Sequence, residues 1–374
     1  MALHKKIARL IKNGEFLYWI NKKWRIWRKR KASSLGLPAI SEKVIRQPVV
    51  VDLPERDPNK APAVSDQNFP YQLMAAVILK NEAPYMVEWL EFHRLVGIQK
   101  IIIYDNGSSD NIQALLKPFI LEGYVELIPW PNFLSQYNHQ HLCYAHVVRY
   151  TAQMTKWLAI IDADEFLFSP TGRPLPQILQ QYGDIPILGA AMRTFGFSGH
   201  EKKPQGLVTE NFLYRFADHE PESNQYRSIV QPRLVRSIIS AARYHHLLNN
   251  VPAYDEDRNP LHNWPTEKPL NSLQLRVNHY LTKSREEFMQ KISRQYFVSL
   301  ERYRERYKKK YKTQAQKDQS AADWAKWMQA SKMKMHRKIF NTPLENFVLD
   351  KEILMYQQKL QEAIRQRLSP VANI

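Results

Sequence analysis

Three carboxylates stand close together after a short apolar run, and their spacing could support chemistry. Asp162, Asp164 and Glu165 follow residues 157–161 (WLAII), a run whose length and isoleucine content predict a buried strand. Carboxylates at the end of a buried strand repel one another and lose hydration unless a cation or strong hydrogen-bond donors meet them. Hard oxygen ligands suit Mn²⁺ or Mg²⁺, which complete their coordination with water and substrate phosphates. The spacing therefore predicts a divalent metal site.

The two aspartates are the expected ligands in this group. Asp162 and Asp164 lie two residues apart and point the same way if the strand continues, whereas Glu165 then points elsewhere and could hold the metal ligands in place. An isolated Asp-x-Asp also occurs as a solvated acidic turn after a core strand. The elements around it favour the metal site.

Those elements predict an α/β domain. Buried strands are expected over 72–79, 100–104 and 124–128. Helices are expected from near Pro84 to a C-cap at Gly97, through Leu115, and over about 136–154. This alternation is typical of a mostly parallel sheet with right-handed crossovers.

Polar loops follow three of the predicted strands. They are Lys80-Asn81-Glu82, Asp105-Asn106-Gly107 and Asp162-Ala163-Asp164. Ligands of open parallel sheets bind beyond the carboxyl ends of the strands, so we expect the loops to converge on one crevice. The first two suit the base and ribose of a nucleotide, and the third suits its diphosphate through a divalent ion.

Composition narrows the class of protein. The 374 residues allow one large α/β domain with appendages or two modest domains, and the formal net charge of +18 implies an anionic partner. The single cysteine, Cys143, excludes an internal disulfide and a cysteine-rich metal site. No apolar run approaches the roughly 20 residues that cross a bilayer, and no small-residue cleavage site follows the basic start. We expect a cytoplasmic protein.

The sequence divides into four predicted parts: a basic amphipathic segment (1–41), a linker (42–70), a nucleotide-binding domain (71–283) and a helical C-terminal region (284–374). The first part combines many Lys and Arg residues with Trp and Leu at helical spacing, which is typical of helices in the membrane interface. A helix that packs its aromatic face on the body of the protein fits equally well. Nucleic-acid binding by this segment is less favoured.

Three sequence blocks in order resemble a known group of enzymes. They are residues 76–82 (AVILKNE) with 88–93 (EWLEFH), 103–110 (IYDNGSSD) and 157–166 (WLAIIDADEF). Together they resemble the Asp-x-Asp-Glu-Phe branch of the glycosyltransferase family 2 clan, and they are similar also to glycosyltransferase family 92. The resemblance covers about residues 71–295 and implies a GT-A fold, a nucleotide-sugar donor and a Mn²⁺ or Mg²⁺ ion.

The resemblance also implies roles for single residues. Asp164 becomes the direct metal ligand and Asp162 a ligand or ribose contact. His279, in Val277-Asn278-His279-Tyr280, becomes the late metal ligand of the fold, with His245 and His246 as competitors. The expected contacts to the donor are Lys80, Asn81, Glu82, Asp105, Asn106, Asp162, Arg227 and Lys283. Arg227 and Lys283 would meet the diphosphate.

The resemblance suggests an inverting reaction, which needs a base for the acceptor hydroxyl. The adjacent Glu-Asp pair that usually supplies it is absent after Asp164. Residues 195–200 (FGFSGH) resemble the aromatic-glycine loop expected near the acceptor. The candidates are therefore His200, Glu201 and Glu210.

Taken together, the sequence predicts a glycosyltransferase that moves a sugar from a nucleotide-sugar, with UDP-sugars favoured, to a glycan or glycolipid in lipopolysaccharide or capsule synthesis. Two alternatives stay open. One is a basic peripheral membrane or nucleic-acid binding protein whose GT-A domain is not catalytic. The other is a metal-dependent nucleotidyltransferase, which also places Asp-x-Asp at a strand end.

The basic first segment generates a prediction about location. Anionic lipid adds about 1 kcal/mol of attraction for each Lys or Arg near a membrane surface, so the full chain should cosediment with anionic vesicles and not with neutral ones. A full-length chain that stays in the supernatant with anionic vesicles would contradict peripheral binding at the inner face of the membrane.

Overall fold

The computed structural model describes residues 49–50, 68–130, 139–235, 237–238, 246–247, 252–262, 265–291, 313, 338–339 and 341–369. The basic segment, most of the predicted linker, and most of the helices expected after residue 291 lie outside these ranges. Val49–Val50, inside the predicted linker, forms strand β1. The four-part division therefore stays a prediction. Among the described residues, no helix is long and apolar enough to cross a membrane.

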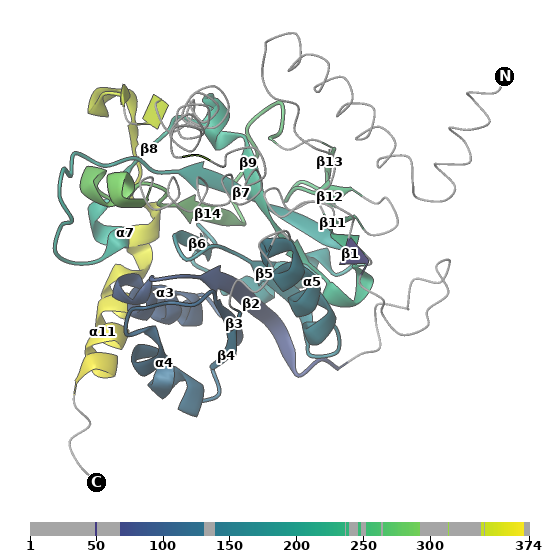
Figure 1. Cartoon of the computed structure of the whole chain (residues 1–374). Coiled ribbons are helices and arrows are strands. Elements are labelled where there is room, and N and C mark those ends of the chain that lie inside the picture. The colour runs from purple at the N-terminus through teal and green to yellow at the C-terminus, as the bar shows by residue number, and fades with distance from the viewer. Residues whose placement is uncertain are drawn as a thin grey trace.

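A mixed sheet forms the centre of the protein (Figure 1). Within the described residues it comprises β2 (Tyr71–Leu79), β3 (Lys100–Asp105), β4 (Val125–Pro129), β5 (Thr155–Ile160), β6 (Glu165–Phe168), β7 (Ile187–Thr194), β9 (Gln225–Val230), β12 (Ala253–Tyr254), β13 (Pro260–Leu261) and β14 (Arg276–His279). The order is β13-β12-β7-β9-β5-β2-β3-β4, and β14 pairs with both β6 and β7. Strands β4, β3, β2 and β5 are parallel, whereas β9 runs antiparallel between β5 and β7.

Two small sheets accompany the central one. In the first, β1 and β11 (His246–Leu247) pair with β10 (Ser237–Ile238), and in the second β8 (Tyr214–Arg215) pairs with β15 (Val348–Leu349). His246, one competitor for the late metal ligand, therefore belongs to a separate sheet, and His245 lies outside the described residues.

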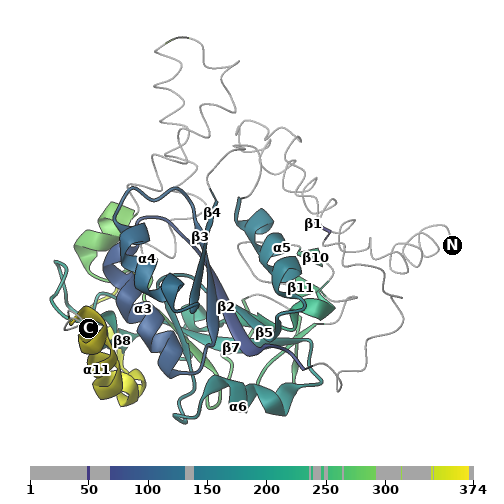
Figure 2. The same ribbon diagram turned by 90° about the horizontal axis from the view of Figure 1, so that it is seen from below.

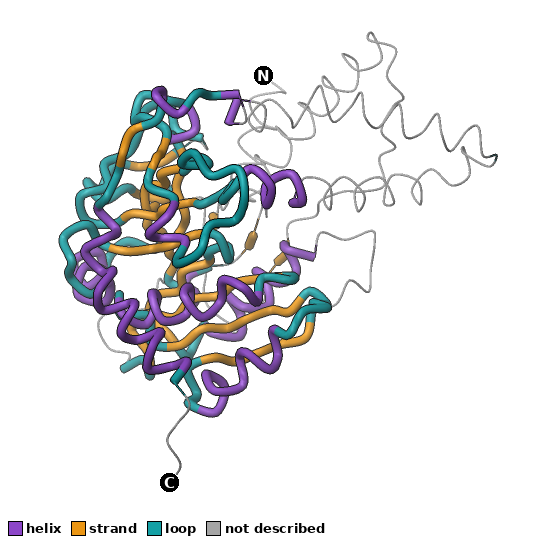
Figure 3. The backbone as a smooth tube through the Cα atoms, turned by 90° about the vertical axis from the view of Figure 1, so that its left-hand side faces the viewer, coloured by secondary structure: helices purple, strands orange, loops and turns teal. Residues whose placement is uncertain are grey.

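Helices cover both faces of the central sheet (Figure 2), and the strands run between them in the side view of Figure 3. Their bounds are α3 (Ala83–Leu95), α4 (Ile112–Leu121), α5 (His139–Thr151), α6 (Leu175–Leu179), α7 (Val208–Asn211) and α11 (Gln357–Leu368). Single-turn 3-10 helices lie at Gln180–Tyr182, Pro221–Ser223, Pro232–Leu234, Leu344–Asn346 and Glu352–Tyr356.

Strand β2 shows why both faces need a cover. Its side chains alternate, so Leu73, Ala75 and Val77 join the core under α3 and α4. Met74 and Ala76 join the core under α5. A strand that is buried on both faces has a continuous hydrophobic sequence, and this pattern identifies residues 72–79 as a buried strand.

The predicted α/β class and the mostly parallel sheet are confirmed. Helix α3 starts at Ala83 with Pro84 in its first turn, and Gly97 follows it with a φ of 97°, as the sequence signals indicated. The buried strand predicted over 157–161 is β5, which ends at Ile160. It does not continue through the carboxylates, because a turn separates it from β6, which begins at Glu165. The three carboxylates therefore lie in and after a turn.

The C-terminal residues return to the main domain. Asp350 accepts hydrogen bonds from Nε of Arg215 at 2.5 Å and Nη2 of Arg276 at 2.6 Å. Arg276 is 1% exposed and also reaches Glu352. Helix α11 lies beside α3 (Figure 1). The C-terminal segment is thus fastened by charged pairs, of which those of Asp350 with Arg215 and Arg276 are buried.

Asp350→Asn should destabilise the protein by about 3 kcal/mol, because it leaves the Arg276 guanidinium buried beside a neutral partner. Burial raises the pKa of Asp350, but the two arginines outweigh it and hold the pKa below its ordinary value. The pair therefore stabilises the wild type above the unfolded pKa and loses this contribution as the pH falls through the folded pKa. Thermal unfolding from pH 7 to pH 3 should show a shallower acid loss for the variant. Asp184→Asn, at an exposed pair with Arg258, is the control; equal behaviour of the two variants would contradict the prediction.

Candidate metal centre and adjoining pocket

A tight turn joins β5 to β6 and presents the carboxylates. The Asp162 amide donates to Oε2 of Glu165 at 3.0 Å, and the Glu165 amide donates to the Asp162 carbonyl at 3.1 Å. Asp162 and Asp164 thus do not share the face of one continuous strand. The expectation that Glu165 points elsewhere is wrong, because the turn brings its side chain back toward the cluster.

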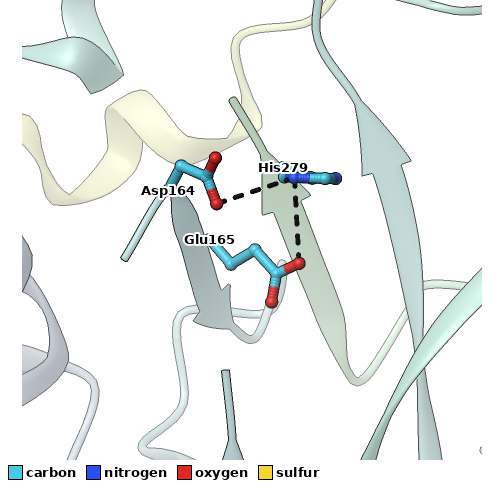
Figure 4. A group of neighbouring side chains, drawn as sticks. All are labelled: Asp164, Glu165 and His279. Carbon is cyan, nitrogen blue, oxygen red and sulfur yellow. Dashed lines mark ion pairs between the residues drawn. The ribbon is translucent and has the colours of Figure 1, made fainter. Parts of the chain in front are cut away.

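Strand β14 supplies the histidine. It runs antiparallel to β6 with His279 directly opposite Glu165, and it runs parallel to β7 on its other side. Residues directly opposite on antiparallel strands carry their side chains on the same face. Nε2 of His279 lies 3.6 Å from Oδ1 of Asp164 and 3.9 Å from Oε1 of Glu165 (Figure 4). These three residues each offer a ligand atom within 4.8 Å of one another.

Arg227, on β9, is buried among the same carboxylates. Its Nε donates to Oε2 of Glu165 at 2.6 Å, and its Nη2 donates to Oδ2 of Asp162 at 2.5 Å and to Oε1 of Glu165. The guanidinium is thus occupied by carboxylates rather than turned to a diphosphate. Asp162 is held by this arginine and is not one of the three residues that converge as possible ligands.

Burial and the neighbouring charges shift the pKa values of these side chains in opposite directions. Burial raises the pKa of Asp162 to about 6, against the lowering effect of Arg227. Burial also raises the pKa of Asp164, but Lys291, His279 and Lys283 outweigh it and hold that pKa well below its usual range. Burial lowers the pKa of His279 to about 4. At neutral pH Asp164 is therefore ionised and the His279 imidazole is neutral.

These residues fit a divalent cation. An ionised carboxylate and a neutral imidazole are the forms that bind metals, and Glu165 adds a second carboxylate. Nδ1 of His279 is buried and has no hydrogen-bond partner within the described ranges, so its tautomer is not fixed by a protein acceptor there. Nε2 is the nitrogen that faces the carboxylates. Carboxylate-rich sites of this kind suit Mn²⁺ or Mg²⁺.

A pocket of about 300 Å³ lies beside the cluster. It is lined by Asn81, Glu82, Pro84, Tyr85, Lys203, Leu281, Thr282, Lys283, Glu286, Glu287, Gln290 and Lys291. The link to the cluster is Lys291, whose Nζ lies 2.5 Å from Oδ2 of Asp164. Nζ of Lys283 lies 3.5 Å from Oε2 of Glu82 and 3.3 Å from the centre of the Tyr85 ring. The structure thus brings three predicted donor contacts, Asn81, Glu82 and Lys283, to one pocket next to the candidate metal ligands.

The first two strand-end loops are joined by hydrogen bonds. The amide of Asn81 donates to Oγ of Ser108 at 3.0 Å, and Oδ1 of Asn81 accepts from the Ser109 amide at 2.7 Å. Asp105 is buried and accepts from the Ser108 amide at 2.8 Å, while Asn106 donates its side-chain amide to the Trp130 carbonyl. Neither Asp105 nor Asn106 lines the pocket, and Lys80 is exposed.

The three candidates for the base make other contacts. Glu210 accepts from the Leu207 amide at 3.0 Å and from the side-chain amides of Gln357 and Gln361, so it caps α7 and binds the C-terminal segment. Nε2 of His200 lies 3.1 Å from the Asn211 carbonyl, to which it can only donate. Glu201 is exposed and lies 3.1 Å from Nε of Arg285. None of the three lines the 300 Å³ pocket.

Several residues at this site were not found from the sequence. Glu165 was expected to point away, and Lys291 was part of a predicted helix without an assigned role. Tyr85 donates its hydroxyl to Glu287, which also accepts from Oγ of Ser284 at 2.6 Å and from the Ser284 amide. The Ser-x-x-Glu spacing of Ser284 and Glu287 is a capping-box pattern, and it could have fixed the start of this helix and hence the face that carries Lys291.

Arg227→Met should lower the free energy of unfolding by about 3 to 5 kcal/mol, because Glu165 is fully buried and would lose its charged partner. Arg227→Lys should recover part of this loss, since one ammonium cannot make the paired contacts of a guanidinium. Chemical denaturation followed by circular dichroism measures both. Arg258→Met, at an exposed ion pair, is the control and should change stability little. Wild-type stability in Arg227→Met would show that the buried pairing contributes nothing.

A family model for glycosyltransferase family 92 matches residues 76–281. A family 92 protein of Oryza sativa subsp. japonica is 31% identical over 182 residues, which are 47% of this chain and 30% of that protein. One from Ricinus communis is 30% identical over 188 residues, 47% of this chain and 31% of that protein. The match thus spans less than a third of the length of these relatives.

Solved structures show a more distant likeness. Staphylococcus aureus TarS, whose complex with UDP-GlcNAc is also solved, has a TM-score of 0.33 at 11% identity over 79% of this chain and 82% of that one. Glucosyl-3-phosphoglycerate synthase of Mycobacterium tuberculosis, solved with Mn²⁺ and UDP, has a TM-score of 0.26 at 14% identity over 48% of this chain and 63% of that one. TM-scores of this size describe a distant likeness of the chain and say nothing about the site. The family model, however, covers more than half of the 374 residues, and the chain therefore belongs to glycosyltransferase family 92.

Proposed function

We propose that this protein is a glycosyltransferase that moves a sugar from a nucleotide-sugar, with UDP-sugars favoured, to a glycan or glycolipid acceptor with the help of Mn²⁺ or Mg²⁺. The observation that carries the proposal is the convergence of Asp164, Glu165 and His279 beside a pocket that contains lysines. Family membership supports the type of reaction. Two carboxylates and a neutral imidazole at the same point support a site that binds a metal and a donor.

The chemistry of sugar transfer matches these side chains. The leaving nucleoside diphosphate gains negative charge as the bond to the sugar breaks, so the site has to stabilise charge there. A divalent ion, when bound, would supply most of that stabilisation as a Lewis acid. Asp164, Glu165 and His279 would hold it, and Arg227 would keep Glu165 and Asp162 in position from behind.

The pocket would receive the rest of the donor. Asn81 and Glu82 lie at the carboxyl end of β2 and offer amide and carboxylate groups for hydrogen bonds to nucleoside hydroxyls. Lys283, held between Glu82 and Tyr85, offers an ammonium to phosphate oxygens. Asp105 ends the neighbouring strand β3 and accepts from the Ser108 amide, and Asn106 donates to the Trp130 carbonyl after β4. There they would help to shape the nucleoside end.

The acceptor and the place of action belong to the same proposal. An inverting transfer requires one group to take the proton of the acceptor hydroxyl, and His200, Glu201 and Glu210 are the candidates from the sequence. Their loop lies against the pocket wall, since the amides of Arg285 and Glu286 donate to the carbonyls of His200 and Glu201, both at 3.0 Å. We place the protein in the cytoplasm, at the inner face of the membrane, in the synthesis of a cell-surface polysaccharide or lipopolysaccharide.

Asp164→Asn should abolish metal-dependent donor binding, with affinity falling at least about a hundredfold, because a neutral amide replaces the ionised ligand. Isothermal titration of the wild type with UDP-, GDP- and CMP-sugars, with and without Mn²⁺, identifies the donor class. The same titration of the variant tests the site. Asp184→Asn removes an equal charge at the exposed pair with Arg258 and should bind as the wild type does.

A folded wild type that binds none of these donors would overturn the proposal in favour of a binding protein without catalysis. Release of inorganic diphosphate from a nucleoside triphosphate would overturn it in favour of a nucleotidyltransferase.

A further inference from the structure

The side chain of Lys291 contacts Asp164, one of the three candidate metal ligands. Residues 285–291 are helical, and Lys291 extends from this helix so that its Nζ lies 2.5 Å from Oδ2 of Asp164 and 3.3 Å from the Leu281 carbonyl. Its side chain is 32% exposed and lines the pocket. Lys291 therefore contacts a candidate metal ligand and also borders the open pocket.

A lysine ammonium and a divalent cation compete for the same carboxylate oxygens. Asp164 accepts Lys291 on Oδ2 and faces His279 with Oδ1, so both of its oxygens are directed at positively charged or metal-binding groups. A metal held between Asp164 and His279 would repel an ammonium this close, because like charges a few ångströms apart in a partly buried site are only weakly screened by water. Lys291 would have to move, and its long unbranched side chain lets it move without the helix.

We infer that Lys291 is a placeholder cation: it neutralises Asp164 while the metal is absent and turns into the pocket to contact the donor diphosphate when the metal binds. The inference rests on the proposed function and assigns a diphosphate-binding role to a residue outside the predicted set. Its position supports both states, since it touches Asp164 and lines the pocket.

The other cations of the site are less able to play this part. Arg227 is enclosed by Asp162 and Glu165 and is 7% exposed. Lys283 is directed at Glu82 and at the Tyr85 ring. Lys203 lies 4.5 Å from the centre of the same ring. Lys291 is the pocket lysine for which the structure records a direct contact with Asp164.

Lys291→Met separates the two halves of the inference because it removes the ammonium and keeps an unbranched side chain. Mn²⁺ alone should bind this variant about tenfold more tightly than the wild type, since the internal competitor is gone. UDP or GDP at saturating Mn²⁺ should bind it about tenfold more weakly, since a phosphate contact is lost. Isothermal titration measures both, and neither readout depends on turnover.

Lys100→Met is the matched control. Lys100 also pairs with a carboxylate, Glu126, at 3.5 Å, but it lies at the start of β3, at the end of the sheet opposite the strand-end loops. This variant makes the same change in net charge and should alter neither affinity. Thermal unfolding of both variants shows whether a change in binding follows from a loss of folding.

The outcomes distinguish the inference from the function on which it rests. Unchanged Mn²⁺ affinity in Lys291→Met, with nucleotide binding by the wild type intact, overturns the placeholder role alone. Weaker Mn²⁺ binding in the variant also overturns it and makes Lys291 a support for Asp164. Nucleotide binding by the wild type that needs no metal, and that Lys291→Met abolishes, would show that Lys291 substitutes for the ion permanently. Absence of both Mn²⁺ and nucleotide binding in the wild type overturns the proposed function itself.

Discussion

One buried guanidinium holds the candidate site together. Arg227 bridges Glu165, which is fully buried, and Asp162, which lies at the start of the turn between β5 and β6. Two carboxylates this close would repel each other and would lose hydration, so the turn could not keep its shape without a positive charge between them. Every other feature of the site, including the opposition of Glu165 to His279, depends on that turn.

The topology of the sheet explains how the arginine arrives there. Strand β9 runs antiparallel between β5 and β7, in a sheet whose other half is parallel. Its reversed direction carries Arg227 past Ala190 of β7 and toward the end of β5, where the turn begins. Strand β14 then enters between β6 and β7 and brings His279. The two insertions assemble, around the turn at residues 161–164, an arginine from position 227 and a histidine from position 279.

The sequence predicted the parts of this structure that depend on local patterns. Apolar runs located β2, β3 and β4, and Pro84 and Gly97 located the ends of α3, because burial on two faces and backbone conformation leave local signatures. The apolar run at residues 157–161 located β5, but the break at residues 161–164 and the start of β6 at Glu165 could not be seen, since Asp162-Ala163-Asp164 could equally continue the strand. Glu165, and not Asp162, joins the candidate metal ligands because of that break and because of the long-range pairings of Arg227 and His279. No local pattern specifies these pairings. The position of Asn81 and Glu82 near the metal ligands was predictable because strand ends converge in parallel sheets, whereas Lys283 was found only through the family resemblance.

The chain from His279 to Lys291 ties the metal ligands to the pocket. It leaves β14, passes Lys283 at a φ of 52°, and starts a helix at the capping box of Ser284 and Glu287. Asn81, which also lines the pocket, has a positive φ as well, of 57°. Such a conformation in a residue with a side chain costs of order 1 kcal/mol and persists where surrounding contacts fix it. Here the contacts are those of Asn81 with Ser108 and Ser109, and of Lys283 with Glu82 and Tyr85. Two residues that line the pocket are thus held by surrounding contacts in backbone conformations that residues with a side chain adopt uncommonly, which favours a cavity built for a ligand over a chance gap between a helix and a loop.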